Sequence, residues 1–205
     1  PKEWSDLLER MHGAGLRAVV LSGGEPMMYS GLLELLGLIA GWLIVEVNTD
    51  GHRITSDVAR QFADLQLKNV QISLDSADPY VHDRYRGKGS WQAACVAINN
   101  LTDAGVPVQA NMTLHADNVA QVDDVQRLVE AFGAVFHAQT LKRVGRAANL
   151  DARLWRAPLA ECATPPLESA LPEMKVHCSS QLGYVAISAE GIMKPCNMTL
   201  RFFEE

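Results

Sequence analysis

The sequence predicts an α/β protein in which parallel strands alternate with helices. Five short β-branched or apolar segments recur along the first 149 residues, and helical spacing of apolar residues appears between them. Such alternation favours parallel strands joined by right-handed crossovers, so the candidates are a doubly wound sheet and a β/α barrel. In both folds ligands bind at the carboxyl ends of the strands.

The predicted strands are short and the predicted helices are amphipathic. An initial helix with Trp4, Leu7 and Leu8 on one face precedes the first strand, and Ser90 is predicted to cap a later helix that ends at Gly105. The strands cover residues 17–21, 43–47, 70–74, 108–114 and 135–141. The apolar stripes of the helices between them are Leu32/Leu35/Leu36/Ile39, Val58/Phe62/Leu65, Trp91/Ala94/Cys95/Ile98/Leu101 and Val122/Val125/Leu128/Val129/Phe132.

Polar residues collect where these strands end. Buried parallel strands should be almost continuously apolar, so polar side chains at one end of each strand indicate a ligand-binding edge. The residues concerned are Glu25 after the first strand, Asn48 to Gly51 after the second, Ser73 and Asp75 at the end of the third, Asn111 within the fourth, and Gly145 and Arg146 after the fifth.

The composition points to a protein that handles small molecules or peptides. A net charge of −6 and the lack of a large basic cluster argue against nucleic acid as the main partner. No apolar segment approaches the roughly 20 residues that cross a bilayer, so we expect no membrane partner and a cytoplasmic location. The four cysteines are too sparse for a disulfide scaffold and are expected to be thiols or metal ligands.

The chain changes character after about residue 149. A segment rich in proline is interpreted as a linker over residues 150–177, and the last part, residues 178–205, is predicted to hold a hairpin. Its two extended segments cover residues 184–188 and 192–196 around a turn that ends at Gly191, and Cys178 and Cys196 lie at its two ends.

The segment Gly23-Gly24-Glu25-Pro26 is the most informative part of the sequence. Glycines let the backbone approach a ligand closely, and the carboxylate of Glu25 can accept from an ammonium group. The same residues are also ordinary in a turn, so the motif alone is a weak signal.

Several motifs on successive units together resemble the radical S-adenosylmethionine enzymes. In chain order they are Gly23-Gly24-Glu25-Pro26, Asn48-Thr49-Asp50-Gly51, Ser73-Leu74-Asp75-Ser76, His82-Asp83-Arg84-Tyr85-Arg86-Gly87 and Val144-Gly145-Arg146-Ala147. The chain looks most like members with a cysteine-rich extension of the SPASM or twitch type, many of which modify ribosomal peptides. The resemblance implies a partial (β/α)6 barrel over residues 1–149, followed by a linker and by the start of the auxiliary-cluster domain at residue 178.

The resemblance also implies roles for individual residues. Gly23, Gly24, Glu25 and Pro26 would hold the methionine amino group of S-adenosylmethionine. Ser73 and Asp75 would contact its ribose or carboxylate, whereas Asn48 and Asn111 would make polar contacts in the mouth of the barrel. Arg86 would pair with a carboxylate, as a cofactor contact or as a salt bridge at a helix entry.

The cysteines are assigned in three ways. Cys178 and Cys196 match the opening half of the auxiliary iron-sulfur motif, and Cys95 is expected to be a buried thiol. Cys162 could be a third ligand or have no role in the cluster. None of the six histidines is assigned a function.

One departure from the family pattern is large. The activating 4Fe-4S cluster of these enzymes is held by a C-x3-C-x2-C triplet, and the 205 residues contain no such triplet. We expect that the sequence lacks about one strand and loop at its amino end, because the first residues begin on a helix. The alternative is a degenerate relative without the chemistry.

The resemblance implies reductive cleavage of S-adenosylmethionine to a 5′-deoxyadenosyl radical, which abstracts hydrogen from a peptide or small-molecule substrate. The cofactors would be S-adenosylmethionine, the 4Fe-4S cluster and an auxiliary iron-sulfur cluster, and an electron donor such as flavodoxin or ferredoxin would be a partner. Two alternatives remain: a cyclase of the molybdenum-cofactor type, and a catalytically dead module that binds a precursor peptide.

Overall fold

The computed structural model describes residues 1–141, 151–155, 186–188 and 193–194. The chain divides into two compact units, Pro1–Thr140 and Leu141–Glu205. The first unit carries every predicted strand and helix of the repeating part of the sequence, so the candidate site is described within it.

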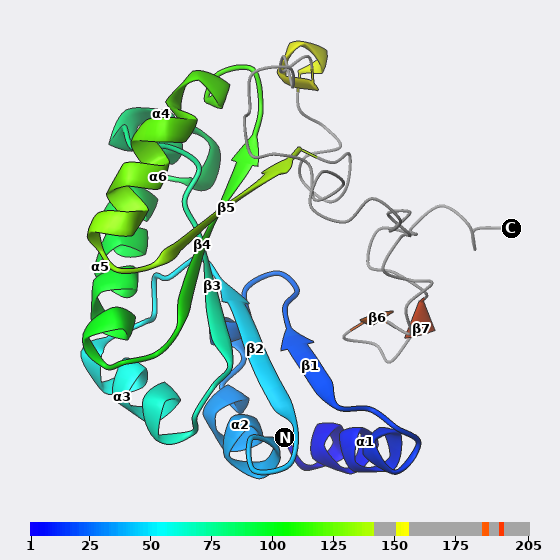
Figure 1. Cartoon of the computed structure of the whole chain (residues 1–205). Helices are drawn as coiled ribbons and strands as arrows, with labels where there is room; N and C mark the ends of the chain where they lie inside the picture. Colours follow the sequence, from blue (N-terminus) through cyan, green and yellow to red (C-terminus); the bar gives the residue numbers. More distant parts are fainter. Residues whose placement is uncertain (142–150, 156–185, 189–192, 195–205) are drawn as a thin grey trace, which may run out of the picture. The chain divides into compact units, whose positions relative to one another are not determined.

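A five-stranded parallel sheet forms the centre of the first unit. Its strands follow one another in the order β1-β2-β3-β4-β5, and each pairs in parallel with the next (Figure 1). A doubly wound sheet reverses its strand order at a switch point, whereas a β/α barrel adds strands in one direction. The sheet is therefore that of a partial barrel, which confirms the predicted α/β fold. The strands are β1 (Ala18–Leu21), β2 (Ile44–Thr49), β3 (Asn69–Ser73), β4 (Val108–Leu114) and β5 (Val135–Thr140).

Helices connect the strands and lie along one side of the sheet (Figure 1). Each of α2, α3, α5 and α6 buries apolar residues of its predicted stripe, because that stripe faces the strands. The α-helices of the first unit are α1 (Lys2–Gly13), α2 (Leu32–Ile39), α3 (Ser56–Asp64), α4 (Pro79–Arg86), α5 (Ser90–Asp103) and α6 (Val122–Ala131), and the 3-10 helices are η1 (Pro26–Met28) and η2 (Val119–Gln121).

The two faces of the sheet differ in chemistry. Strand residues alternate between faces, and in β2 and β3 one set is buried and apolar, including Val45, Val47, Val70 and Ile72. Apart from the exposed Ile44 at the start of β2, the alternate residues are half-buried and polar. They include Glu46, Asn48, Asn69, Gln71 and Ser73. One face is therefore the helix-covered core, and the other is the inner face of the partial barrel.

Helix α4 was missed by the apolar-stripe prediction. Its only buried residue is His82, so it lacks an apolar stripe. The helix is instead started by Asp78, whose carboxylate accepts from the Tyr80 amide at 2.8 Å, and by Pro79 at the first helical position.

The predicted cap of α5 is wrong. Ser90 is the first helical residue, and the N-cap is Gly89, which has no side chain to accept a bond. The carboxylate of Asp83 takes that role from α4, accepting from the amides of Gly89 at 2.6 Å and Trp91 at 2.9 Å. These bonds, led by that from Trp91, lower the pKa of Asp83.

The second unit is described only in short pieces. They are the 3-10 helix η4 (Ala152–Trp155) and an antiparallel pair of strands, β6 (Ala186–Ile187) and β7 (Met193–Lys194). This pairing agrees with the predicted hairpin, whereas its turn at Gly191 lies outside the described residues. The division into a linker over 150–177 and a cluster domain from 178 remains a prediction.

Candidate functional site

Glu25 ties the loop after β1 to the loop after β2. One carboxylate oxygen, Oε1, accepts from the amide of Met27 at 3.0 Å and from the hydroxyl of Thr49 at 2.5 Å. The other oxygen, Oε2, accepts from the amide of Asp50 at 2.7 Å. Thr49 is almost fully buried, so this contact fixes the carboxylate against the end of β2.

The Glu25 carboxylate keeps room for a ligand. An ionised carboxylate offers about four acceptor positions, and three are used by the bonds to Met27, Thr49 and Asp50. A Cβ placed on Gly23 or Gly24 would meet no atom within 4 Å, so the backbone beside Glu25 faces open space. Gly23 also has φ +139°, a conformation that other residues rarely adopt. The motif can thus offer an open backbone and a fixed anion to an ammonium group.

A second set of polar groups lies across the ends of β3, β4 and β5. Ser73 is paired with Asn111, and Asn111 with His137, so the three residues stand side by side on neighbouring strands. Asn111 is buried, and its Oδ1 lies 2.7 Å from Nδ1 of His137, which is the donor because an amide oxygen can only accept. Ser73 is half-buried, and its hydroxyl makes no hydrogen bond to any residue that the structure describes. As far as the described part of the chain goes, Ser73 therefore keeps its donor and acceptor for a ligand at this edge.

A row of carboxamide side chains also lies on the inner face, two residues before Ser73 on β3 and two residues before Asn111 on β4. Asn48 is paired with Gln71, and Gln71 with Gln109. All three side chains are half-buried, and among the described residues none of the three amides has a hydrogen-bond partner. Half-buried amides can bond to ordered water or to a polar ligand, so this row is suited to either.

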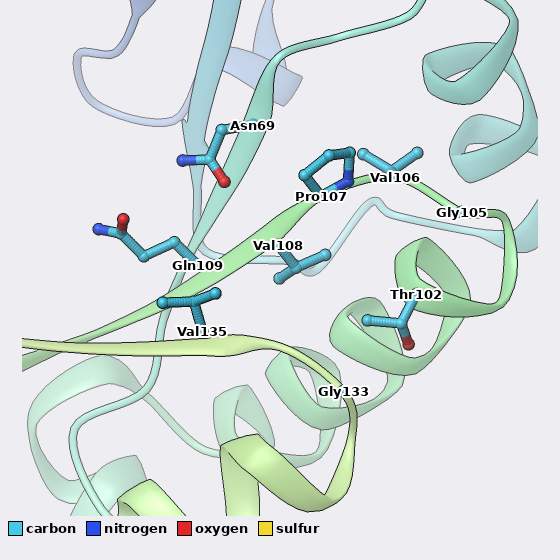
Figure 2. A pocket seen from close by; sticks show the side chains of 9 residues that line it. All are labelled: Asn69, Thr102, Gly105, Val106, Pro107, Val108, Gln109, Gly133 and Val135. Carbon is cyan, nitrogen blue, oxygen red and sulfur yellow. The ribbon is translucent and has the colours of Figure 1, made fainter.

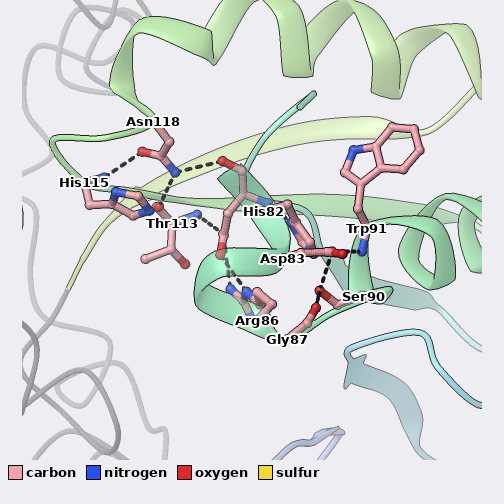
Figure 3. A network of polar contacts seen from close by, with 10 residues as sticks. His82, Asp83, Arg86, Gly87, Ser90, Trp91, Thr113, His115 and Asn118 are labelled. Atoms are coloured by element: carbon pink, nitrogen blue, oxygen red, sulfur yellow. Dashed lines mark hydrogen bonds and ion pairs between the residues drawn. The ribbon is translucent and has the colours of Figure 1, made fainter. Parts of the chain in front are cut away.

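Asp75 is bonded to His82, Arg86, Thr113 and Asn118, the residues that Figure 3 labels around it. Its carboxylate accepts from Nε and Nη2 of Arg86 at 2.5 and 3.1 Å, and from the amide of Thr113 at 2.8 Å. Its own amide donates to Nδ1 of His82 at 3.0 Å, and its carbonyl accepts from the Asn118 side chain at 2.8 Å. The predicted Arg86 pairing is therefore made with a carboxylate of this chain, and it joins the last residue of α4 to the end of β3.

Two buried histidines stand beside this network, and sequence reasoning assigned neither. Burial is the main cause that lowers the pKa of His82 to about 4, although the nearby carboxylate of Asp75 opposes it. His82 is thus neutral, as its acceptor role requires. Burial also lowers the pKa of His115, which follows β4. The available sequence signal was the spacing of His82 and Arg86, which places both on one face of a helix.

The cysteine predictions divide between described and undescribed residues. Cys95 is buried on α5, and burial raises its thiol pKa to about 11, which agrees with the predicted buried thiol. Cys162, Cys178 and Cys196 lie outside the described residues, as do Gly145 and Arg146. Within residues 1–141 and the short described pieces that follow, no three His, Cys, Asp or Glu side chains gather as a metal site.

A hollow of about 410 Å³ lies at the amino ends of the strands, opposite to the polar groups described above (Figure 2). It is lined at the amino ends of the strands by residues such as Asn69, Val108 and Val135, and by the loops at Gly105 and Gly133. Ligands of α/β sheets bind at the carboxyl ends of strands, and the polar groups at Glu25 and Ser73 lie there. We therefore place the candidate site at the carboxyl edge.

Sequence comparison places the chain among known proteins. The model of the Radical SAM superfamily matches residues 1–129. The mycofactocin maturase MftC of Mycolicibacterium smegmatis is 36% identical over 151 residues, which are 73% of this chain and 38% of the maturase. The AdoMet-dependent heme synthase of Oleidesulfovibrio alaskensis is 31% identical over 156 residues, 75% of this chain and 40% of the synthase. The chain thus spans about two fifths of the length of these relatives.

Solved structures agree on the fold. SuiB of Streptococcus suis bound to S-adenosylmethionine superposes with a TM-score of 0.76 at 17% identity, covering 100% of this chain and 55% of SuiB. SuiB bound to its precursor peptide SuiA gives a TM-score of 0.64 at 16% identity, covering 73% of this chain and 34% of that one. Among the helices that the structure describes, none is both long and apolar enough to span a membrane.

Proposed function

The chain belongs to the radical S-adenosylmethionine superfamily, and we propose that it supplies the cofactor-binding barrel of an enzyme that modifies a ribosomal peptide or protein. Relatives named as maturases of mycofactocin and of sporulation killing factor, and as a PqqA peptide cyclase, support a peptide substrate. The observation that carries the proposal is the open Gly23-Gly24 backbone beside a carboxylate that retains an acceptor position.

We propose that S-adenosylmethionine lies along the carboxyl edge. Its ammonium group would meet Glu25 and the backbone of the motif up to Pro26, since an ammonium and a carboxylate form a charge-assisted bond. Ser73 would donate to or accept from a ribose hydroxyl or the methionine carboxylate. Asn48 and Asn111 would line the inner face below, where Asn111 is held by His137.

In the complete protein a 4Fe-4S cluster would supply the electron for reductive cleavage of S-adenosylmethionine, and hydrogen abstraction from the substrate would follow. This chain's residues bind and orient the sulfonium and keep water away from it. Flavodoxin or ferredoxin is the proposed electron source. A cytoplasmic location without nucleic-acid or membrane partners is proposed from the composition.

The inner face supports a peptide rather than a charged small molecule as substrate. Asn48, Gln71 and Gln109 each offer a donor and an acceptor with no net charge, which matches the N–H and C=O groups of a peptide backbone. A small-molecule substrate remains the alternative. Peptide-dependent stimulation of S-adenosylmethionine cleavage, lost in Gln71→Leu/Gln109→Leu protein that still binds the cofactor, would support the peptide.

We also propose an auxiliary iron-sulfur cluster of SPASM or twitch type held by Cys178 and Cys196. The support is sequence spacing around Gly191 and the antiparallel pairing of β6 and β7, since a hairpin can bring two thiolates to one metal centre. In the complete protein, Cys178→Ala/Cys196→Ala should lose about four irons, whereas Cys95→Ala should lose none. Equal iron in the double variant and the parent would make the tail cysteines structural thiols.

The experiment that tests the proposed function is an anaerobic assay for 5′-deoxyadenosine. The complete protein, reconstituted with iron and sulfide, should form it in the presence of reductant. Residues 1–205 alone should not, because they contain no C-x3-C-x2-C triplet. Failure of the complete protein to form the product would favour the dead binding module.

A further inference from the structure

Asp75 is bonded through its carboxylate and through both of its backbone groups at the carboxyl edge. Its carboxylate uses three of about four acceptor positions, on Arg86 and on the amide of Thr113. Its amide and carbonyl are bonded as well, to His82 and Asn118. Only 6% of its side chain is exposed, against 25% of that of Arg86. Little of this residue is left for a ligand to contact.

The partners of Asp75 come from three parts of the fold (Figure 3). His82 and Arg86 belong to α4, Thr113 belongs to β4, and Asn118 follows β4. Asn118 is itself fixed, since its side chain also donates to the Thr113 carbonyl at 2.9 Å and accepts from the His115 amide at 2.8 Å. Asp75 therefore joins the end of β3, helix α4 and the end of β4.

The join lies two residues beyond Ser73. In an extended chain this spacing is about 7 Å, so the position of Asp75 limits where the Ser73 hydroxyl can lie. Ser73 is in turn paired with Asn111 on β4, the strand to which Asp75 is bonded through Thr113. Fixing the position of Asp75 thus also fixes Ser73 and Asn111 next to each other at the ends of β3 and β4.

We propose that Asp75 is a positioning residue, fixed by His82, Arg86 and Asn118, that places Ser73 against S-adenosylmethionine and does not itself touch the cofactor. The inference rests on the proposed function, because it assumes that the cofactor binds at this edge. In this proposal the Arg86 side chain affects cofactor binding by holding the Asp75 carboxylate, and it does not contact the cofactor.

A double-mutant cycle on cofactor affinity tests the proposal. The dissociation constant of S-adenosylmethionine is measured by calorimetry on the reconstituted complete protein and on Ser73→Ala, Asp75→Asn and the double variant. Asp75→Asn should weaken binding roughly tenfold in the parent and less than about twofold in the Ser73→Ala background. A similar loss in both backgrounds would show an independent contact and overturn the proposal, as would no loss in either.

Arg86→Lys keeps the test valid if Asp75→Asn does not fold. Lysine retains the charge but cannot form the two-pronged contact, so affinity should fall about threefold in the parent and not at all in Ser73→Ala protein. Asp124→Asn removes an exposed pair with Arg127 and is the matched control, with unchanged affinity. A parent that does not bind S-adenosylmethionine would overturn the proposed function together with this inference, whereas binding with additive losses would overturn the inference alone.

Discussion

Two carboxylates hold loops at the same edge of the sheet, and they differ in how much of each is left free. Glu25 is half-buried, has three donors and lies beside glycines that face open space. The Asp75 carboxylate also has three bonds from donors, but Asp75 is buried and both of its backbone groups are bonded. The comparison separates a group that can still take a ligand from one that organises the groups around it.

The largest expected effect is the loss of stability when Asp75 is removed. Asp75→Ala leaves Arg86 and the Thr113 amide without an acceptor, which should lower the free energy of unfolding by about 3 kcal/mol. Glu25→Ala should cost only about 1 kcal/mol, because the Glu25 carboxylate is half-buried whereas that of Asp75 is buried. Urea unfolding followed by tryptophan fluorescence measures both, and equal losses would contradict the distinction.

The Asp75 region should also be the more acid-sensitive one. His82 has a pKa of about 4 in the folded protein and an ordinary value of 6.5. Between these values the unfolded chain binds a proton that the folded chain does not, so stability is complete above 6.5 and falls towards pH 4. The loss should approach 3 kcal/mol, at about 1.4 kcal/mol per pH unit.

His82→Gln should flatten this part of the pH profile of unfolding. Glutamine can still accept from the Asp75 amide but does not titrate in this range. The charges that act on His82 are those of Asp75, Arg86, Asp83 and His52, and all four residues are kept in the variant. An unchanged slope between pH 4 and 6.5 in His82→Gln protein would assign the acid sensitivity to other groups.

Cofactor affinity should respond directly to Glu25. Glu25→Ala in the complete protein should weaken S-adenosylmethionine binding by roughly 1.5 to 3 kcal/mol, the scale of a lost hydrogen bond to a charged group. The sheet should remain folded, because the residue lies at its edge. Calorimetry gives the affinity and circular dichroism gives the fold. Unchanged affinity would make Glu25 a turn residue that only joins two loops.

The smallest expected effect concerns the support of Glu25. Thr49→Val removes the hydroxyl that donates to Glu25 and accepts from the Gly51 amide at 3.2 Å. The shape is kept, so the free energy of unfolding should fall by about 1 kcal/mol. Thr49→Ser, which keeps the hydroxyl, is the control and should lose less. The two variants are compared by thermal unfolding.

The strands and five amphipathic helices could be predicted because their residues follow the spacing that burial imposes. Helix α4 could not, since it is held by Asp78, Pro79 and polar contacts to Asp75 instead of by an apolar stripe. The positions of Glu25, Ser73 and Asn111 at one edge followed from parallel strands ending together. The partners of Asp75 did not follow, because they depend on how α4 and β4 pack against β3.

The bond between Asp75 and Asn118 joins residues that are 43 positions apart. Since the strands follow one another in chain order, each β/α unit can dock on its predecessor as the chain is synthesised. At the end of β3 two of the fixing groups lie on and after β4, just as the Glu25 loop after β1 is fixed by groups on and after β2. We expect the loop after β3 to become ordered only when β4 has been synthesised and has paired with β3. The proposed cofactor site at the end of β3 would therefore form one β/α unit later than β3 itself.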